Sequence, residues 1–482
     1  MWAPAFAGVR GERDLIKSFL SAASAAVLLA QPLAAQTLRP DQAKFRELYQ
    51  ELVETNTTLS AGSCTAAAEK MAARLKAAGY SDQELTLFSV PEHPKEGGLV
   101  AVLKGSDAKA KPMLLLAHLD VVEAKPEDWS RDPFKLVEEN GFFYARGSAD
   151  DKSMAAIWTD SLIRYNQEGF RPKRTIKMAL TCGEETTYAF NGADWLAKNR
   201  PELVAAEFAL NEGGGGRLDA QGNRQVLAIQ VGEKAAQNYT LETTNPGGHS
   251  SQPVPDNAIY ELADAIEAIR GYEFPVRFNE TTRAFFTGTS AAVGGEMGAA
   301  IKALLADPGD KAADAIVSRD KTFHSTLRTT CVATLLKAGH AENALPQRAT
   351  ANVNCRIFPG ETVQGTLAQL RTLAGPKVKV SANAPIRPTA ISPALDPKIL
   401  GPIKTVAAKH FPGVPLLPIM STGATDGIFL EAIGIPVYGV PGIFFESDLN
   451  GAHGLNERMR VRSLYEGRDY LYDLVKVYAN QG

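Results

Sequence analysis

The sequence is poor in cysteine, with four in 482 residues, and none of them has the C-x-x-C spacing of zinc and redox motifs. So small a number excludes a disulfide scaffold, in which bridges take the place of a hydrophobic core. Cys331 and Cys355 lie in strand-like segments of one region. They either pair in an oxidising compartment or stay as two separate buried thiols, and the sequence leaves both alternatives open.

An excess of either charge is also missing, because 51 lysines and arginines face 54 aspartates and glutamates and no basic cluster occurs. We therefore expect no nucleic-acid partner and no binding to an anionic membrane. The N-terminal apolar stretch "FLSAASAAVLLAQPLAAQ" follows several basic residues and is too short to cross a bilayer. We predict a cleaved signal peptide over residues 1–35, secretion to a bacterial periplasm and no further membrane span. A membrane-tethering anchor is the alternative.

The chain is longer than a single core usually grows, and its 45% hydrophobic content is typical of a globular protein, so we expect two domains. Strand-like runs alternate with helical segments over residues 36–235 and the α/β texture returns over 359–482. This pattern predicts an α/β catalytic domain in two parts, with helices on both faces of a sheet. Residues 236–358 combine a helix with alternating strands, which predicts a smaller inserted α+β domain. Residues 280–325 mix Gly and Ala with helical signals and are the hardest to interpret.

Imidazole and carboxylate side chains recur where strand-like runs end, at His118, Asp120, Asp150, Asp151, Glu184, Glu185, Glu212 and, much later, His453. Ligand sites of α/β sheets gather at strand carboxyl ends. Buried carboxylates need a counter-charge, and no matching set of lysines or arginines is present, which leaves a metal. These donors suit zinc, and two histidines with three carboxylates can hold two ions that share a bridging ligand. Residues two apart in a strand share a face, so Asp120 can orient His118.

Each of these motifs has a simpler interpretation when it is taken alone. An H-x-D pair more often lies at the surface or caps a helix, "GEE" is usually a solvated turn, and "DDK" is usually a helix N-terminus. Their shared position at strand ends of one domain favours the metal site. The other histidines have no carboxylate partner at an informative spacing in the sequence. They are interpreted as structural or surface residues: His93, His324, His340 and His410.

A set of motifs occurs in a characteristic order: "HLDVV", "ARGSADDKS", "CGEET", "NEGG", "PGGHSS", "RIFPGE" and "AHGLNE". The set resembles the acetylornithine deacetylase, succinyl-diaminopimelate desuccinylase and carboxypeptidase family of dinuclear zinc hydrolases. The spacing from "DVV" to "GFFYARGSADDK" is most similar to the carboxypeptidase S and N-acyl-amino-acid hydrolase branch. The resemblance covers nearly the whole chain after the predicted signal. It implies a zinc-exopeptidase-like domain, with a central mixed sheet flanked by helices, and an inserted ferredoxin-like lid or dimerisation domain.

The resemblance also implies roles for the strand-end residues. It implies two Zn²⁺ ions per subunit, with Co²⁺ or Mn²⁺ as substitutes. Asp150 would bridge the two ions, and the remaining ligands would be His118 and Glu212 in partnership with Glu185 and His453. The peptide bond between Asp150 and Asp151 is typically cis in the family. Glu184 corresponds to the general base, and Asp120 to the acid that supports His118.

Further residues are implicated in substrate binding. Arg356 matches an arginine that pairs with the substrate carboxylate in relatives, although alone it would be interpreted as a surface arginine in an ion pair. His249 resembles a residue that reaches into the active site of a partner subunit and stabilises the oxyanion, which implies a homodimer. Without the resemblance, His249 would be interpreted as a loop histidine. Other segments similar to substrate-contacting ones contain Asn343, Ser421, Thr422 and Gly423.

These observations predict a dinuclear zinc hydrolase that cleaves a peptide or amide bond next to a carboxylate-bearing amino acid. The substrate would be a small peptide or an N-acyl amino acid, and the metal-bridging water would be activated by Glu184. A dipeptidase of the carnosinase type is the alternative enzyme. A catalytically silent periplasmic binding protein is the alternative outside enzymes; loss of Glu184 or of a ligand would favour it, and neither is lost.

Overall fold

A ten-stranded sheet forms the centre of the computed structural model, which describes residues 38–186 and 190–481. The predicted signal segment, residues 1–35, lies outside the described residues. The sheet is mixed, as the sequence predicted. Its strands in spatial order are β1 (Leu85–Val90), β2 (His93–Leu103), β6 (Ile176–Thr181), β3 (Met113–His118), β7 (Phe208–Asn211), β17 (Val437–Gly439), β9 (Arg224–Glu233), β8 (Gly214–Leu218) and β18 (Phe444–Phe445), with β16 (Leu416–Ser421) paired to β9.

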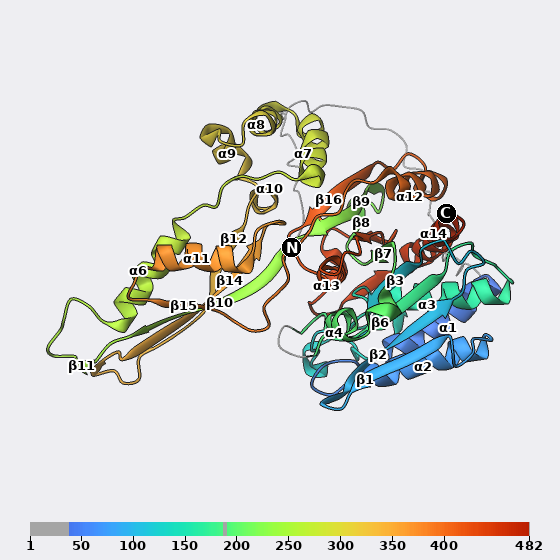
Figure 1. The fold of residues 1–482 in the computed structure, drawn as a ribbon, viewed down its shortest axis with the longest axis horizontal. Coiled ribbons are helices and arrows are strands. Elements are labelled where there is room, and N and C mark those ends of the chain that lie inside the picture. The colour runs from blue at the N-terminus through green and yellow to red at the C-terminus, as the bar shows by residue number, and fades with distance from the viewer. Residues whose placement is uncertain (1–37, 187–189, 482) are drawn as a thin grey trace, which may run out of the picture.

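Helices cover both faces of this sheet (Figure 1). Within β3, Met113 and Leu115 join the core on one face, whereas Leu114 and Leu116 join the core on the other. A strand buried on both faces reads as a continuous apolar run, as β3 does. The helices on the first face are α1 (Pro40–Val53), α2 (Cys64–Ala77), α3 (Lys152–Gln167), α12 (Pro397–His410) and α14 (Val461–Ala479), and those on the second are α4 (Gly192–Asn199), α5 (Pro201–Val204) and α13 (Gly427–Glu431).

A separate three-stranded sheet consists of β4 (Val137–Glu139), β5 (Phe142–Tyr144) and β19 (Arg458–Arg460). The short helices are η1 (Pro126–Asp128) and η2 (Leu449–Gly451). In the part of the chain that is described, no helix combines the length and the apolar character needed to span a membrane.

A second sheet follows directly, because a single residue, Lys234, separates β9 from β10 (Ala235–Thr244). Its four strands are ordered β12 (Thr330–Ala338), β14 (Arg348–Ile357), β10 and β15 (Lys379–Ala382), and α6 (Ala258–Arg270) and α11 (Val363–Ala374) pack on one face. Figure 1 shows this layer extending away from the central sheet, with the pair β11 (Gly248–His249) and β13 (Ala344–Leu345) at its tip. The sheet therefore reaches beyond residue 358, whereas the division into domains stays a prediction.

The segment that was hardest to interpret forms four helices, α7 (Glu280–Val293), α8 (Gly295–Ala306), α9 (Lys311–Val317) and α10 (Lys321–Thr326). Their starts follow local chemistry: the side chains of Asn279, Asp310 and Asp320 accept hydrogen bonds from the first turns of α7, α9 and α10. Phe285 and Phe286 pack into a separate core that also contacts β16. Side-chain N-caps start these helices and the core that they form is small, so the hydrophobic pattern of residues 280–325 did not by itself indicate them.

Two disulfides are present. Cys331 and Cys355 face each other across β12 and β14 and are bonded, so the first of the two alternatives holds. The second bridge, Cys64–Cys182, was not predicted. It joins the start of α2 to the residue after β6, across 118 positions of the chain.

Candidate metal centre and active site

Three parallel strands carry His118, Asp120, Glu184, Glu185 and Glu212 to one edge of the central sheet, whereas Asp150 and Asp151 precede α3 and His453 follows η2. β3 ends at His118 and is followed by Asp120, and the neighbours of β3 on either side are β6 and β7. Gly183 turns the chain after β6 with a φ of 98°, where a β-carbon would collide with the Phe190 carbonyl oxygen. Glu184 and Glu185 follow this turn. Because parallel strands end at the same edge, these side chains gather there with Glu212, which follows β7.

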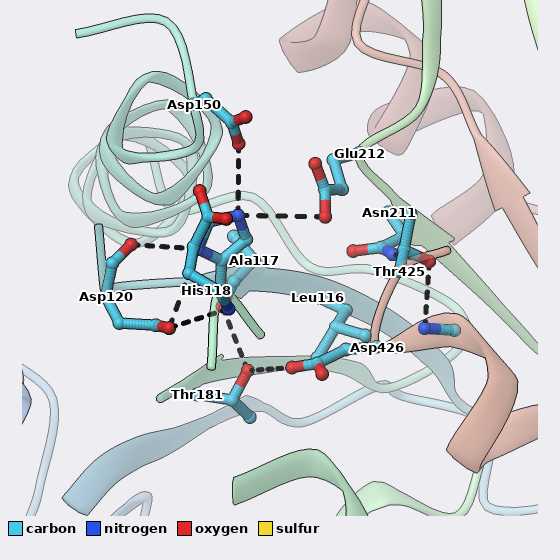
Figure 2. A network of polar contacts seen from close by, with 12 residues as sticks. Leu116, Ala117, His118, Asp120, Asp150, Thr181, Asn211, Glu212, Thr425 and Asp426 are labelled. Atoms are coloured by element: carbon cyan, nitrogen blue, oxygen red, sulfur yellow. Dashed lines mark hydrogen bonds and ion pairs between the residues drawn. The ribbon is translucent and has the colours of Figure 1, made fainter. Parts of the chain in front are cut away.

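His118 is buried, with 2% of its surface exposed, and its two ring nitrogens have different neighbours (Figure 2). Nε2 lies 3.2 Å from Asp150 Oδ1 and 3.7 Å from Glu212 Oε1. Nδ1 lies 3.0 Å from the backbone oxygen of Asp120 and 3.6 Å from its carboxylate Oδ1. Asp120 therefore holds the ring while Nε2 faces the carboxylates.

His453 completes a second group on the other side of Asp150. Its Nε2 lies 2.9 Å from Glu185 Oε1 and 3.2 Å from Asp150 Oδ2. Asp150 thus directs one carboxylate oxygen toward each imidazole. The next peptide bond, Asp150–Asp151, is cis, as the resemblance implied.

Ligand atoms of these residues lie close enough together to hold metal ions. One trio, His118, Asp150 and Glu185, has its donor atoms within 4.8 Å of one another, and so does a second trio, His118, Asp151 and Glu212. Asp151, to which the sequence assigned no role, is therefore a further candidate ligand. Its Oδ2 is buried without a hydrogen-bond partner among the described residues.

The electrostatics of the cluster favour a bound cation. Burial raises the pKa of Glu212 well above its usual value, and it does the same for Glu184. Hydrogen bonds to Asp150 and Glu185 raise the pKa of His453 to about 10. Carboxylates thus outnumber the local positive charges, and divalent ions would offset the excess. Imidazole nitrogen with carboxylate oxygen is a donor set that such ions accept.

The loop that carries Asp150 is held by a residue that sequence reasoning missed. Glu457 is buried and pairs with Arg146, with 2.7 Å between Oε2 and Nη1. The same carboxylate accepts backbone hydrogen bonds from Gly147, Ala149 and Asp150. Glu457 lies in the motif "AHGLNE", four residues after His453, and that closeness was the available signal.

Asp426 is a second supporting residue that was missed. It accepts hydrogen bonds from Thr181, at the end of β6, and from Asn191. Burial raises the pKa of Asp426 to about 6. Figure 2 shows this carboxyl group below His118, on the side away from Asp150.

The substrate residues that the sequence predicted fall into two groups. Arg356 is partly buried on β14; burial lowers its pKa, and the charges of Glu184 and Glu233 oppose that effect, which places the guanidinium near the cluster. The loop after β16 also leads back to the central sheet: Lys234 donates its backbone N–H to the Ser421 oxygen, and Ser421 Oγ accepts from Gly423. Thr422 lies between these two loop residues.

His249 and Asn343 form the other group and are not brought to the cluster within one chain. Both are exposed, and the Asn343 oxygen accepts a hydrogen bond from Ser250. His249 lies on β11, at the tip of the small layer in Figure 1, where its Nδ1 contacts the Ser251 hydroxyl at 2.7 Å.

A helix-covered mixed sheet, with histidines and carboxylates grouped at one edge beside a second smaller sheet, defines a hydrolase of the metal-dependent exopeptidase class. The family model for "Peptidase family M20/M25/M40" matches residues 114–477. The chain belongs to this family and is a metallopeptidase or amidohydrolase.

Individual relatives agree with this assignment. The chain is 28% identical to the human N-fatty-acyl-amino acid synthase/hydrolase PM20D1, over 81% of this chain and 79% of the relative. It is 27% identical to a probable carboxypeptidase S-like protein 2 of Dictyostelium discoideum, over 78% and 74%. Among solved structures, an M20 family metallo-carboxypeptidase from Sulfolobus solfataricus superposes with a TM-score of 0.70, at 19% identity over 92% of this chain and 100% of that one.

Proposed function

We propose that the protein is a dinuclear zinc hydrolase that releases an amino acid with a free carboxylate from a small peptide or an N-acyl amino acid. One observation carries this proposal: Asp150 lies between two imidazole–carboxylate pairs, with one oxygen toward each imidazole. The N-acyl-amino acid and carboxypeptidase relatives support the substrate class.

The donor set supports a division of the ligands into two groups. His118 and Glu212 would hold one ion, Glu185 and His453 the other, and Asp150 would contact both. When bound, zinc ions polarise the scissile carbonyl and lower the pKa of an attacking water. Co²⁺ and Mn²⁺ accept the same ligands and would be substitutes.

Glu184 is the residue that we propose as general base. Glu184 comes directly before Glu185, which is a proposed metal ligand, whereas Glu184 itself belongs to neither proposed ligand group. Its carboxylate would take the proton of the water and deliver it to the leaving nitrogen. Asp120 has a supporting role, because it contacts the His118 ring and holds its orientation.

Arg356 is proposed to bind the substrate carboxylate. Its planar guanidinium suits two parallel hydrogen bonds to that group, and its position near Glu184 would set the scissile bond close to the base. Ser421 ends β16, and Thr422 and Gly423 lie between β16 and α13. All three are proposed to contact the rest of the substrate.

We propose a homodimer because two of the expected residues lie far from the cluster of their own chain. His249 is exposed at the tip of the small layer (Figure 1). His249 of the partner subunit would then reach the active site and donate a hydrogen bond to the developing oxyanion. Asn343, which contacts the same loop through Ser250, would accompany it.

Secretion to the periplasm is proposed from the pattern of residues 1–35, with the two disulfides as support. All four cysteines are bonded, and such bonds persist in oxidising compartments.

The experiment that tests the function is amino-acid release from a mixed panel of dipeptides and N-acyl amino acids, followed by mass spectrometry. The chain is loaded with zinc in one arm and treated with a chelator in the other. Release that the chelator abolishes is expected, and the products separate an acyl-amino-acid hydrolase from a carnosinase-like dipeptidase. Absence of any release by zinc-loaded protein would contradict the proposal and favour the silent binding protein.

A further inference from the structure

The Cys64–Cys182 disulfide lies against the proposed catalytic centre. The sulfur atoms of Cys64 and Cys182 and one carboxylate oxygen of Asp120 all lie within 4.8 Å of one another. Asp120 is the residue that holds the His118 ring, and Cys182 is two positions before Glu184. No step of the proposed reaction uses either sulfur.

One carboxylate oxygen of Asp120 makes no hydrogen bond with the described residues. Its Oδ2 accepts the backbone N–H of Glu185 at 2.9 Å, whereas Oδ1 is buried and has no hydrogen-bond partner among the described residues. His118 Nδ1 lies 3.6 Å from Oδ1. Asp120 is 3% exposed, so bulk water does not satisfy this oxygen.

The bridge also borders a cavity. A cavity of about 180 Å³ is lined by both cysteines and Asp120, together with residues from the start of α2 and the strand β2. His93 and Glu96 line the same cavity, with 3.0 Å between Nδ1 and Oε1, and Glu96 Oε2 has no hydrogen-bond partner in the described part of the chain. A small reductant or a metal ion in this cavity would lie beside the bridge, although Cys64 and Cys182 are themselves only 2% and 4% exposed.

We propose that reduction of this bridge creates a metal site, separate from the two of the catalytic centre, made of Cys64, Cys182 and Asp120. A dithiol or phosphine reductant supplies two electrons, the S–S bond breaks, and each sulfur takes up one proton. A soft divalent ion such as Zn²⁺ or Cd²⁺ then displaces both protons and binds two thiolates and one carboxylate oxygen. Thiolate donors select such ions over hard cations.

Occupation of this site inhibits the enzyme. A metal bound to Asp120 Oδ1 takes the carboxylate oxygen that lies 3.6 Å from His118 Nδ1, so the ring keeps the backbone oxygen of Asp120 at 3.0 Å but loses the negative charge beside it (Figure 2). The ion also ties Cys182 to Asp120, just before the turn that carries Glu184. Excess metal therefore inhibits the reduced protein and leaves the oxidised protein active.

The second disulfide provides a matched control. Cys331 and Cys355 lie in the small sheet, and no trio of metal-capable side chains within residues 38–186 and 190–481 includes either of them. The double variant C331S/C355S removes these thiols and keeps Cys64–Cys182 as the one reducible bond.

The test titrates full-length C331S/C355S protein, preloaded with zinc, with Cd²⁺ before and after reduction by a phosphine. We expect one additional equivalent of bound metal and a cadmium–thiolate ultraviolet absorption in the reduced sample only, with at least a tenfold loss of hydrolysis. C64S/C182S in the same background should show none of these changes. An absent cadmium–thiolate band, or equal cadmium binding in oxidised and reduced samples, would overturn the proposal.

Two controls keep the result decisive. Circular dichroism checks that the reduced protein stays folded, and unfolding on reduction would equally overturn the proposal. The band and the metal count do not depend on turnover, so they test this site even if the proposed substrates are not cleaved. If C64S/C182S does not fold, the comparison of oxidised with reduced C331S/C355S still decides the question.

Discussion

Lys234 connects the two sheets, and burying its ammonium group should make stability depend on pH. The residue is 0% exposed, and its Nζ has no hydrogen-bond partner among the described residues. Burial lowers the pKa of Lys234 to about 7, and the positive charges of Arg356 and Arg328 act in the same direction while Glu361 opposes them. Replacement by methionine, Lys234→Met, removes the titrating group and keeps most of the volume.

The direction of the pH dependence follows from the number of protons that the folded and the unfolded states bind. Lys234 is about half protonated in the folded chain at pH 7 and mostly neutral from about pH 8 to pH 10, whereas the unfolded chain keeps it mostly protonated. The unfolded state therefore binds more protons, and this group makes wild-type stability rise with pH. A pKa lowered from 10.5 to about 7 corresponds to about 5 kcal/mol at most. The variant should therefore be more stable than wild type by the largest margin near pH 7. That margin should shrink by roughly 3 to 4 kcal/mol toward pH 10.

Thermal unfolding in the presence of a chelator measures this margin without a contribution from bound metal. Wild type and Lys234→Met are compared at several pH values from 7 to 10, with Lys404→Met, an exposed position on α12, as the matched control. The control should track wild type at every pH. A constant difference between Lys234→Met and wild type over the whole range would refute the reasoning, because it would mean that the buried amine does not titrate there.

Three further outcomes are expected. Glu184→Ala should keep its metal content and lose about 10²- to 10⁴-fold in turnover, as measured by amino-acid release; near-normal rates would exclude it as the base. His453→Ala should retain less metal by elemental analysis, and an unchanged stoichiometry would remove it from the ligand set. Glu457→Gln should lower the free energy of unfolding by about 3–5 kcal/mol because the buried Arg146 loses the opposite charge that it pairs with. The exposed control Glu202→Gln should leave the melting temperature unchanged, and equal effects of the two variants would contradict the buried-pair argument.

Much of the fold could be predicted from local patterns. The apolar run of β3, buried on both faces, marks a strand of a helix-covered sheet, and α2 follows its helical periodicity from Cys64 to Ala77. The helices of residues 280–326 were harder, because caps at residues such as Asp310 determine them more than an apolar stripe does. The pairing of β15 with β10 was missed, since two strands more than a hundred residues apart carry no mark of their partnership.

The sequence by itself determined which residues are available for chemistry, and its strand-end prediction holds for His118, Glu184, Glu185 and Glu212. It was wrong for Asp150 and Asp151, which lie at the start of α3, and for His453, which follows η2. Hydrophobic periodicity is a local property, and parallel strands bring their ends to one edge, so the grouping of His118, Glu185 and Glu212 could be inferred. The tertiary structure alone decided that Asp150 lies between two imidazoles and that Glu457 meets Arg146 across 311 positions. It also decided that Cys64 bonds Cys182 beside Asp120. Such contacts depend on how whole layers pack, and no residue pattern within either segment encodes the distance between them.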